Sequence, residues 1–451
     1  MSDTRHLDPN RSSRRSFVKK TALGAAGLAV SPAIWTRPGF ARVNTPSNEL
    51  RFGAIGVRGM GFTNVNSFLQ QDDIRCVAIC DVDDEVLSRR SNDTEERQGS
   101  APETYNDYRR LLERDDLDFV IIGSPDHWHC LQAVHAMEAG LDVYLEKPLA
   151  NSIGECDIIL AASQQTGKKV QMGQWQRSGP HWRDAVDFVH SGALGNIRTV
   201  KAWAYQGWMK PVPILADESV PAGVDYDMWL GPMPHRPFNR NRFHFNFRWF
   251  WDYAGGLMTD WGVHIVDYAL YGMNAPYPQS VMATGGKMAY PDDASETPDT
   301  LQAVFDFGQF TMLWEHATGI DLGPYGRNHG VAFIGNNGTL VVNRQGWEVI
   351  AEEEGGEALV QVPATPTYEG SDVQRHTLNF TNAIRHGEAL NAPVDVGHKA
   401  AVVCHMGNIA FKTGRKIHWD QESRAFVGDE EANALTSIEY QNGWEMPGYT
   451  L

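Results

Sequence analysis

Two residues in the middle of the chain, Asp260 and His264, have the types and the spacing needed for proton transfer. They are four residues apart, so on one helix they would share a face and could converge on one ligand atom. His264 is the natural general base, because the ordinary pKa of histidine lies near neutrality. Oxidation of an alcohol needs such a base, since a proton leaves oxygen while hydride leaves carbon. A hydrogen-bonded structural histidine is the alternative interpretation.

A glycine-rich turn near residue 56 indicates a phosphate-binding site. The segment reads Gly53-Ala54-Ile55-Gly56-Val57-Arg58-Gly59-Met60-Gly61. Such a turn lets a pyrophosphate approach the positive end of the next helix. Gly56 and Gly61 occupy the first and third glycine positions of G-x-G-x-x-G, but Arg58 stands at the middle one. Gly59 could supply the close approach instead and Arg58 could contact phosphate, whereas an ordinary tight turn is the alternative.

An acidic residue follows the next apolar run. Asp81 comes twenty residues after Gly61, where an acid accepts hydrogen bonds from the adenosine ribose hydroxyls. A carboxylate there also repels a 2′-phosphate, so NAD is favoured and NADP is not excluded. The alternative is a solvated strand end.

These residues need a scaffold that brings strand ends together. From Leu50 onward, short apolar runs alternate with helical patterns, which predicts an α/β fold with a parallel, doubly wound sheet. Ligands of such sheets bind at the carboxyl ends of the strands. The expected strands are 50–55, 75–80, 118–123 and 142–145, and the expected helices are 63–70 and 129–139.

Two further motifs each come directly after an expected strand. They are Ser124-Pro125-Asp126-His127-Trp128-His129 and Glu146-Lys147-Pro148. Together with the glycine-rich turn and the segment from Gly255 to His264, they resemble the Gfo/Idh/MocA family of oxidoreductases. The resemblance covers about residues 48 to 451, and Arg58 is its main departure from the family pattern.

The resemblance implies a two-domain architecture. An NAD(P)-binding Rossmann domain, residues 48–172, would precede a substrate-binding and oligomerisation α/β domain, residues 173–451, with a large, mostly antiparallel sheet. The active site would lie between these domains, and a homodimer or homotetramer would form through the outer face of the large sheet.

The resemblance also implies roles for single residues. Lys147 would be the active-site lysine, with a peptide bond to Pro148 that can be cis, and Asp260 and His264 would complete a polar cluster around the substrate hydroxyl. The chemistry agrees, because Lys147 can hydrogen-bond the reacting oxygen and stabilise developing alkoxide charge. A surface lysine is the alternative. The residues expected to bind the cofactor are Gly56, Arg58, Gly59, Met60, Gly61, Asp81, Ser124, Pro125, His129, Glu146, Lys147 and Gln174.

Aromatic segments in the second half suggest a carbohydrate or polyol substrate. Residues 203–208 and 244–252 mix aromatic rings with polar side chains, and sugars stack on rings while their hydroxyls meet polar groups. Core packing is the alternative for each tryptophan, and a structural salt bridge is the alternative for Arg177. The residues expected to contact substrate are Lys147, Arg177, His244, Arg248, Trp251, Asp260 and His264.

The first 42 residues differ in charge from the rest. They hold eight basic and two acidic residues, a balance of +6, and the whole chain carries −17, which leaves −23 for residues 43–451. Arg14-Arg15-Ser16-Phe17-Val18-Lys19 precedes a mildly apolar run too short to span a membrane. This order is typical of a twin-arginine signal peptide, which predicts export of the folded protein to the periplasm or another extracytoplasmic space by the twin-arginine translocation machinery. It predicts no stable membrane anchor, and a disordered basic tail is the alternative.

The remaining composition excludes several classes of function. The acidic body argues against nucleic acid as a partner. Five cysteines without a paired motif are expected to be buried and free of disulfides. Sixteen histidines are present, but none lies in a cluster with metal-ligand spacing, so no metal is expected.

Three functional hypotheses follow. The first is an exported NAD(P)-dependent oxidoreductase acting on a secondary hydroxyl of a sugar, polyol or glycoside. The second is an NAD-dependent glycoside hydrolase, in which transient oxidation of a carbon acidifies its neighbour and elimination cleaves the glycosidic bond. The third is a noncatalytic sugar or nucleotide sensor, which the presence of Lys147, Asp260 and His264 disfavours.

Overall fold

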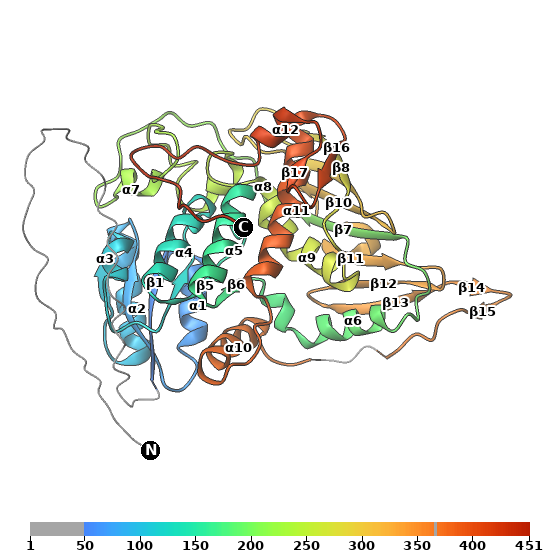
Figure 1. Ribbon diagram of the computed structural model, residues 1–451, viewed down its shortest axis with the longest axis horizontal. Helices are drawn as coiled ribbons and strands as arrows, with labels where there is room; N and C mark the ends of the chain where they lie inside the picture. The colour runs from blue at the N-terminus through green and yellow to red at the C-terminus, as the bar shows by residue number, and fades with distance from the viewer. Residues whose placement is uncertain (1–48, 365–367) are drawn as a thin grey trace, which may run out of the picture. The chain divides into compact units, whose positions relative to one another are not determined.

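Two large sheets organise the part of the chain that the computed structural model describes, residues 49–364 and 368–451 (Figure 1). The predicted signal peptide, residues 1–42, lies outside the described residues. The first sheet is parallel throughout, with the strand order β3-β2-β1-β4-β5-β6. Its strands are β1 (Leu50–Ile55), β2 (Ile74–Cys80), β3 (Glu103–Tyr105), β4 (Phe119–Ile122), β5 (Asp142–Leu145) and β6 (Val170–Met172).

Helices connect these strands as the alternating pattern predicts. The first begins three residues earlier than expected, because the backbone enters helix directly after Gly59. The helices of this part are α1 (Met60–Phe68), α2 (Asp84–Gln98), α3 (Tyr108–Leu112), α4 (His129–Glu138) and α5 (Ile153–Thr166).

The second sheet is mixed and mostly antiparallel, which confirms the predicted fold class. Its order is β13-β12-β11-β7-β10-β9-β8-β16-β17, and in it β7 and β10 pair in parallel. The turn Gly335 to Gly338 joins β11 and β12 as a hairpin. The strands are β7 (Thr199–Gln206), β8 (Ser280–Gly286), β9 (Thr300–Asp306), β10 (Thr311–Thr318), β11 (His329–Ile334), β12 (Gly338–Asn343), β13 (Gly346–Ala351), β16 (Ile417–Asp420) and β17 (Ala425–Phe426), and a separate small pair is β14 (Glu353–Glu354) and β15 (Glu357–Ala358).

The segment expected to be one helix around Asp260 and His264 is two helices. Asp260 ends α8 (Gly256–Asp260), and His264 lies in α9 (Gly262–Gly272). The break falls at Trp261, whose carbonyl oxygen accepts from the amide of His264 at 3.0 Å in a tighter turn. The other helices of the second half are α6 (Pro180–His190), α7 (Tyr226–Leu230), α10 (Asp372–His386), α11 (Val394–Thr413) and α12 (Glu430–Ala434).

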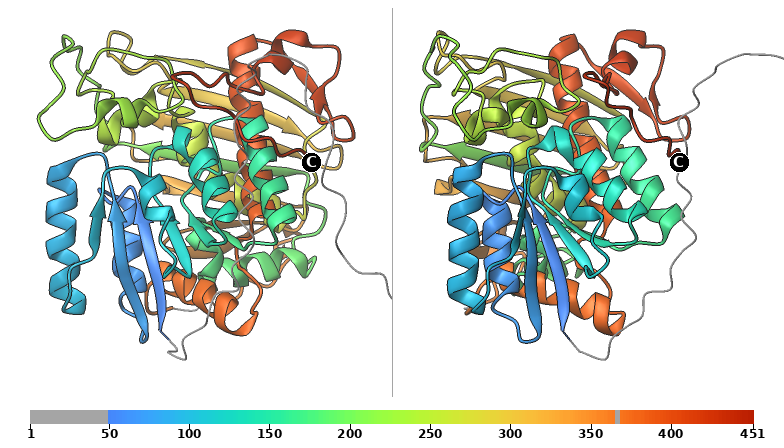
Figure 2. Two further views of the ribbon diagram at one scale, coloured as in Figure 1. Left: turned by 60° about the vertical axis from the view of Figure 1, so that its left-hand side comes forward. Right: turned by 90° about the vertical axis from the view of Figure 1, so that its left-hand side faces the viewer.

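Helix α10 packs against the first sheet, although it follows seven strands of the second sheet in sequence, β7 to β13 (Figures 1 and 2). The ring centroid of Phe380 lies 5.3 Å from that of Phe119 on β4 and 6.1 Å from that of Phe68 on α1. The hydroxyl oxygens of Thr377 and Ser67 are 2.8 Å apart. Residues 372–386 therefore contribute to the core of the dinucleotide half.

The last residues of the chain also return to this half. The Trp444 ring lies 5.0 Å from the ring of Trp128 and 6.5 Å from that of Tyr108, centroid to centroid. The guanidinium of Arg109 lies 5.0 Å from the same indole. The C-terminal segment thus covers two aromatic residues next to the strand ends.

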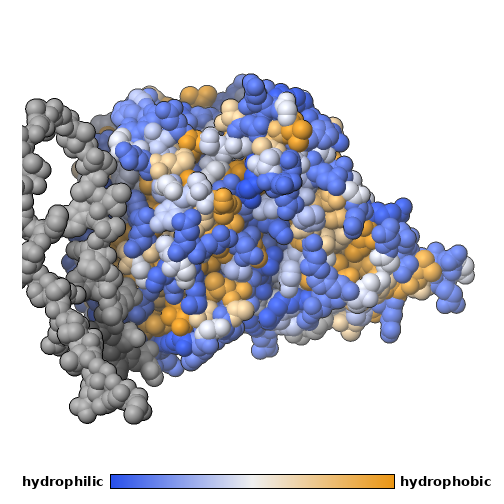
Figure 3. Space-filling view, in the orientation of Figure 1, coloured by the Kyte–Doolittle hydropathy of each residue, from blue (hydrophilic) through white to orange (hydrophobic). Residues whose placement is uncertain are grey.

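Apolar side chains fill the interior, and polar side chains predominate on the surface (Figure 3). All five cysteines are buried and none forms a disulfide. Hydrophilic side chains predominate on the face seen in Figure 3, with hydrophobic ones in smaller patches. Within residues 49–364 and 368–451, no helix combines the length and apolar character that a membrane crossing requires.

Candidate functional site

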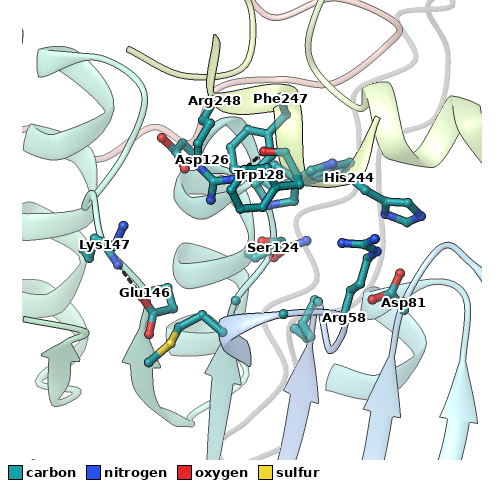
Figure 4. Close-up of a pocket in the computed structure, with 18 of the residues that line it drawn as sticks. Arg58, Asp81, Ser124, Asp126, Trp128, Glu146, Lys147, His244, Phe247 and Arg248 are labelled. Atoms are coloured by element: carbon teal, nitrogen blue, oxygen red, sulfur yellow. Dashed lines mark hydrogen bonds between the residues drawn. The ribbon is translucent and has the colours of Figure 1, made fainter. Parts of the chain in front are cut away.

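A cavity of about 450 Å³ opens at the carboxyl ends of the parallel strands (Figure 4). Residues of the second half close its other side. Figure 4 shows Lys147 and Glu146 at one side and Arg58, Asp81 and His244 at the other. The sequence-predicted residues that line the cavity are Gly56, Arg58, Gly59, Met60, Asp81, Ser124, Pro125, Glu146, Lys147, His244, Arg248, Asp260 and His264.

Glycines bring backbone segments together at the first strand end. Gly56 has φ +75°, and a Cβ atom there would lie 2.4 Å from the amide nitrogen of Ser124. A Cβ atom on Gly61 would lie 2.0 Å from the carbonyl oxygen of Gly56. Gly59 precedes α1 without a side-chain cap, which leaves the first helical amides available to an anion. These contacts require glycine at positions 56 and 61, whereas a Cβ atom at Gly59 would meet open space.

The acid at the end of β2 stands beside this turn. Oδ2 of Asp81 accepts a hydrogen bond from the amide of Val57 at 3.0 Å, and burial raises the pKa of Asp81 to about 6. Arg58 lies beside Asp81 in Figure 4. A glycine turn, a free helix N-terminus and an acid at the second strand end together fit the pyrophosphate and ribose of a dinucleotide.

His244 belongs to the same end of the cavity. Its Nε2 lies 2.8 Å from Oδ2 of Asp83, two residues after Asp81, and its φ is +56°. Burial, followed by the charge of Arg58, lowers the pKa of His244 to about 4. The geometry therefore groups His244 with the predicted ribose-binding residues, away from Lys147.

At the opposite end, Lys147 and Asp260 form an ion pair across the two halves of the chain. Nζ of Lys147 lies 2.8 Å from Oδ1 of Asp260, and Nε of Arg248 lies 3.5 Å from Oδ2. Burial raises the pKa of Asp260, but the charges of Lys147 and Arg248 outweigh burial and hold that pKa well below its usual value. The peptide bond between Lys147 and Pro148 is cis.

His264 lines the cavity next to this ion pair. Its ring centroid lies 6.1 Å from that of Trp175 and 6.4 Å from that of Trp261. Nδ1 is buried without a hydrogen-bond partner among the described residues, which leaves Nε2 as the ring nitrogen open to the cavity. Burial and then the charge of Lys147 hold the pKa of His264 well below its usual value. The imidazole is therefore neutral, with one unprotonated ring nitrogen, and it is a weaker base than an exposed histidine.

Asp126 is a cavity residue that the sequence analysis did not select. It lies in a short 3₁₀ helix, Asp126–Trp128, at the end of β4. Burial, together with the charge of Asp260, raises its pKa to about 8, against the opposing charges of Lys147 and Arg248. Its place in the Ser124 to His129 motif, directly after a strand, was the available signal.

Other lining residues were also missed, and many of them are aromatic. Trp208 lines the cavity, whereas Trp203 of the same predicted segment is fully buried in the core. The clearest omission is a cation, Arg344, from the turn between β12 and β13. The further aromatic lining residues are Tyr108, Trp128, Trp175, Trp229, Phe245, Phe247 and Trp261.

Two predicted cofactor residues, Glu146 and His129, form hydrogen bonds that support the wall of the cavity. Glu146 accepts from Nδ2 of Asn64 at 2.7 Å, and burial raises its pKa. His129 is fully buried, with its ring nitrogens 2.7 Å from the carbonyl oxygen of Pro148 and 3.0 Å from that of Ser124. His129 therefore joins the two motif segments behind the cavity and does not line it.

Four other predicted residues also lie outside the lining, and they are Gly61, Arg177, Trp251 and Gln174. Arg177 forms a two-pronged ion pair with Asp267, with both N–O distances 2.7 Å, which is the salt-bridge alternative. The indole of Trp251 donates to the carbonyl oxygen of Glu296 at 3.0 Å. Gln174 is buried. In the part of the chain that the structure describes, no cluster of three histidine, cysteine or acidic residues could hold a metal ion.

Both halves of the chain match family models. Residues 50–174 match the model described as an oxidoreductase family with an NAD-binding Rossmann fold. Residues 189–446 match the C-terminal alpha/beta domain of an oxidoreductase family. Each match falls on one of the two sheets and the elements around it.

Curated relatives match a shorter region. A glycosyl hydrolase family 109 protein of Shewanella baltica is 29% identical over 201 residues, which is 41% of this chain and 44% of the relative. An alpha-N-acetylgalactosaminidase of Shewanella oneidensis is 32% identical over the same shares. The match thus spans less than half the length of these relatives.

Solved structures share the fold over most of the chain. The WlbA dehydrogenase of Bordetella pertussis, in complex with NADH and UDP-GlcNAcA, has a TM-score of 0.61 at 17% identity, over 82% of this chain and 99% of that one. The aldose-aldose oxidoreductase of Caulobacter crescentus, complexed with glycerol, has a TM-score of 0.61 at 20% identity over the same shares.

Proposed function

Because the chain belongs to the Gfo/Idh/MocA oxidoreductase family, we propose that it transfers hydride between NAD and a secondary hydroxyl of a sugar, polyol or glycoside. The observation that carries this proposal is the position of Lys147, Asp260 and His264. All three line the cavity that also contains the glycine turn and Asp81.

NAD is the cofactor that the family's Rossmann domain binds, as predicted. The close approach at Gly56 and Gly61, the uncapped start of α1 and the acid at Asp81 fit its pyrophosphate and ribose. Bound NAD supplies the nicotinamide ring that exchanges hydride with the substrate.

At the other end of the cavity, His264 and Lys147 would act on the substrate hydroxyl and its proton. Nε2 of neutral His264 accepts the hydroxyl proton, and the Lys147 ammonium donates a hydrogen bond to the same oxygen as its negative charge grows. Asp260 holds Nζ of Lys147 in position through the 2.8 Å contact. The ion pair thus presents Lys147 to the reacting oxygen as a hydrogen-bond donor and not as a base.

A direct test combines cofactor binding with a substrate screen. NADH fluorescence would report binding to the purified protein, and a panel of sugars, polyols and glycosides would be followed by NADH absorbance. Dinucleotide-dependent oxidation of at least one of them is the expected result. Bound NADH with no turnover of any compound would favour a sensor, and absent NADH binding would overturn both enzymatic proposals.

A glycoside hydrolase is the second candidate function. Partial relatives bear that name at 29–32% identity, and Asp126 is a buried carboxyl with a pKa raised to about 8. A carboxyl that keeps its proton at neutral pH can protonate a leaving glycosidic oxygen. Release of p-nitrophenol from nitrophenyl glycosides, dependent on NAD but without net NADH formation, would establish this reaction in place of simple oxidation.

We also propose that the protein is exported by the twin-arginine route. The order Arg14, Arg15, Phe17 and Lys19 before an apolar run supports this proposal. Fractionation of cells should place the native chain in the periplasm and the double variant R14K/R15K in the cytoplasm. An unchanged location in that variant would contradict it.

Self-association through the large sheet is a further proposal. Met282 on β8 and Val304 on β9 stand directly opposite each other and are 50% and 39% exposed. Two such apolar side chains on an outer sheet face suit contact with another copy. Light scattering should give a dimer or tetramer, and V304E should shift the mass towards the monomer.

A further inference from the structure

At the end of the cavity that holds Lys147 and His264, Arg344 has no ion-pair partner. Arg344 follows β12 and lines the cavity. Two other arginines nearby are compensated, because Arg248 has Asp260 at 3.5 Å and Arg177 has Asp267 at 2.7 Å. Within residues 49–364 and 368–451, no carboxylate lies at salt-bridge distance from Arg344.

Two indole rings and an amide oxygen hold the guanidinium of Arg344 in position without forming an ion pair with it. Its central carbon lies 4.7 Å from the ring centre of Trp175 and 4.6 Å from that of Trp261. Nε and Nη2 donate to Oε1 of Gln176 at 3.4 and 3.1 Å. Indole faces stabilise a cation, but they leave the hydrogen-bond donors along its edge for another acceptor.

The charge of Arg344, which has no ion pair, affects its neighbours. Burial lowers the pKa of Arg344 to about 10, against the more distant charges of Asp260 and Asp372, which raise it. Burial and then the Arg344 charge lower the pKa of His329 to about 3, and Arg344 adds to the lowering at His264. A buried charge is costly unless it is paired, so the cavity at this end favours an anion.

The position of Arg344 separates it from the cofactor phosphates. The two tryptophans that flank its guanidinium, Trp175 and Trp261, also lie beside His264. The phosphate-binding features, which are the glycine turn and the start of α1, belong to the first strand end. Arg344 is therefore placed to meet the substrate near the reacting hydroxyl.

We propose that Arg344 binds a carboxylate of the substrate, and that the substrate is an acidic sugar with its carboxylate against Arg344 and a hydroxyl towards His264. This inference rests on the proposed function and names its substrate class. A planar guanidinium matches a carboxylate with two parallel hydrogen bonds. The two indoles fix the plane in which those bonds form.

The test compares acids with their uncharged amides. NADH binding is first measured by fluorescence for the native protein, R344Q, R344K and the exposed control R198Q. Calorimetry on the NAD-loaded proteins then measures two pairs of probes, D-glucuronate with D-glucuronamide and D-galacturonate with D-galacturonamide. Glucose 6-phosphate serves as a differently shaped anion.

The expected result is specific to charge. At least one acid should bind the native protein about tenfold to a hundredfold more tightly than its amide, the range for a hydrogen bond between charged groups. R344Q should remove that difference without changing amide or NADH affinity, R344K should restore part of it, and R198Q should behave as the native protein.

The contrary outcomes separate the two proposals. Equal binding of acid and amide in both pairs, an equal loss of both in R344Q, or no binding of any probe to the NAD-loaded protein would overturn the role of Arg344. Tighter, Arg344-dependent binding of glucose 6-phosphate than of either acid would overturn the carboxylate assignment. Failure to bind NADH would instead overturn the proposed function itself.

Discussion

Nζ of Lys147 lies 2.8 Å from Oδ1 of Asp260, and this contact joins the end of β5 to the end of α8. The pair is mostly buried, with side-chain exposures of 16% and 14%. The contact keeps an ammonium group at the substrate end of the cavity, although the two residues are 113 positions apart. It also keeps Asp260 ionised, so the pair carries no net charge beside His264.

Replacement of Lys147 by alanine should reduce turnover far more than cofactor binding. Removal of one donor to a developing oxyanion typically costs about 10²- to 10³-fold in kcat. Steady-state kinetics and NADH titration would measure both effects, with the exposed Lys416→Ala as the matched control. A fall in kcat of less than about threefold would contradict the assigned role.

Replacement of Asp81 by alanine should change the choice of cofactor. The variant loses a ribose acceptor, so NAD affinity should fall about tenfold or more. NADP affinity should rise relative to NAD, because Arg58 stays beside the site without the repelling carboxylate (Figure 4).

Fluorescence titration with both dinucleotides would measure that ratio. The double variant D81A/R58A should lose the gain for NADP, and the exposed Arg97→Ala should leave the ratio unchanged. An unaltered NAD to NADP ratio in D81A would argue against a ribose contact.

The proton on Asp126 should make stability depend on pH. Its pKa is raised to about 8 in the folded protein, whereas an unfolded aspartate has a pKa near 3.9. The folded state therefore binds more protons between these values, and the stabilisation from the protonated carboxyl is lost as the pH rises from about 4 to 8.

Asp126→Asn removes this dependence. Urea unfolding at pH 5 and pH 8 should show that the variant gains free energy of unfolding relative to the native protein as the pH rises, by an amount on the order of a few kcal/mol. Equal differences at both pH values would show that Asp126 ionises normally. If the hydrolase reaction operates, the variant should also lose glycoside cleavage.

Trp444→Ala should weaken NAD binding without touching the cavity lining. Trp444 supports Trp128 and Tyr108 from behind, and each lost aromatic pair costs about 0.5–1.5 kcal/mol. A several-fold rise in the Kd for NADH and a lower Tm are expected, with recovery in Trp444→Phe. The neighbouring exposed Glu445→Ala serves as the control.

The sequence was most informative where function depends on local backbone geometry. The glycine turn, the acid after β2 and the motifs after β4 and β5 each lie within a few residues of a strand end. Strand ends of a parallel sheet meet at one edge, so local patterns were enough to group these residues.

The features that could not be predicted depend on contacts between residues far apart in the sequence. Arg344 meets its hydrogen-bond partner Gln176 across 168 positions. Helix α10 reaches the first sheet only after seven strands of the second sheet, β7 to β13, have been formed by the preceding chain. No local pattern encodes such contacts. Arg177 shows the converse case, because its position suggested the site but Asp267, 90 residues away, holds its guanidinium.

The contact of Trp444 with Trp128 has a consequence for how the protein is made. A ribosome releases the chain from its N-terminus onward, so the first sheet and its motifs emerge long before residue 444 of 451. Tyr108 and Trp128 lack their cover until residue 444 has been added, 316 positions after Trp128. A stop codon at position 444 would leave every proposed catalytic side chain in place and one wall of the cofactor cavity unsupported.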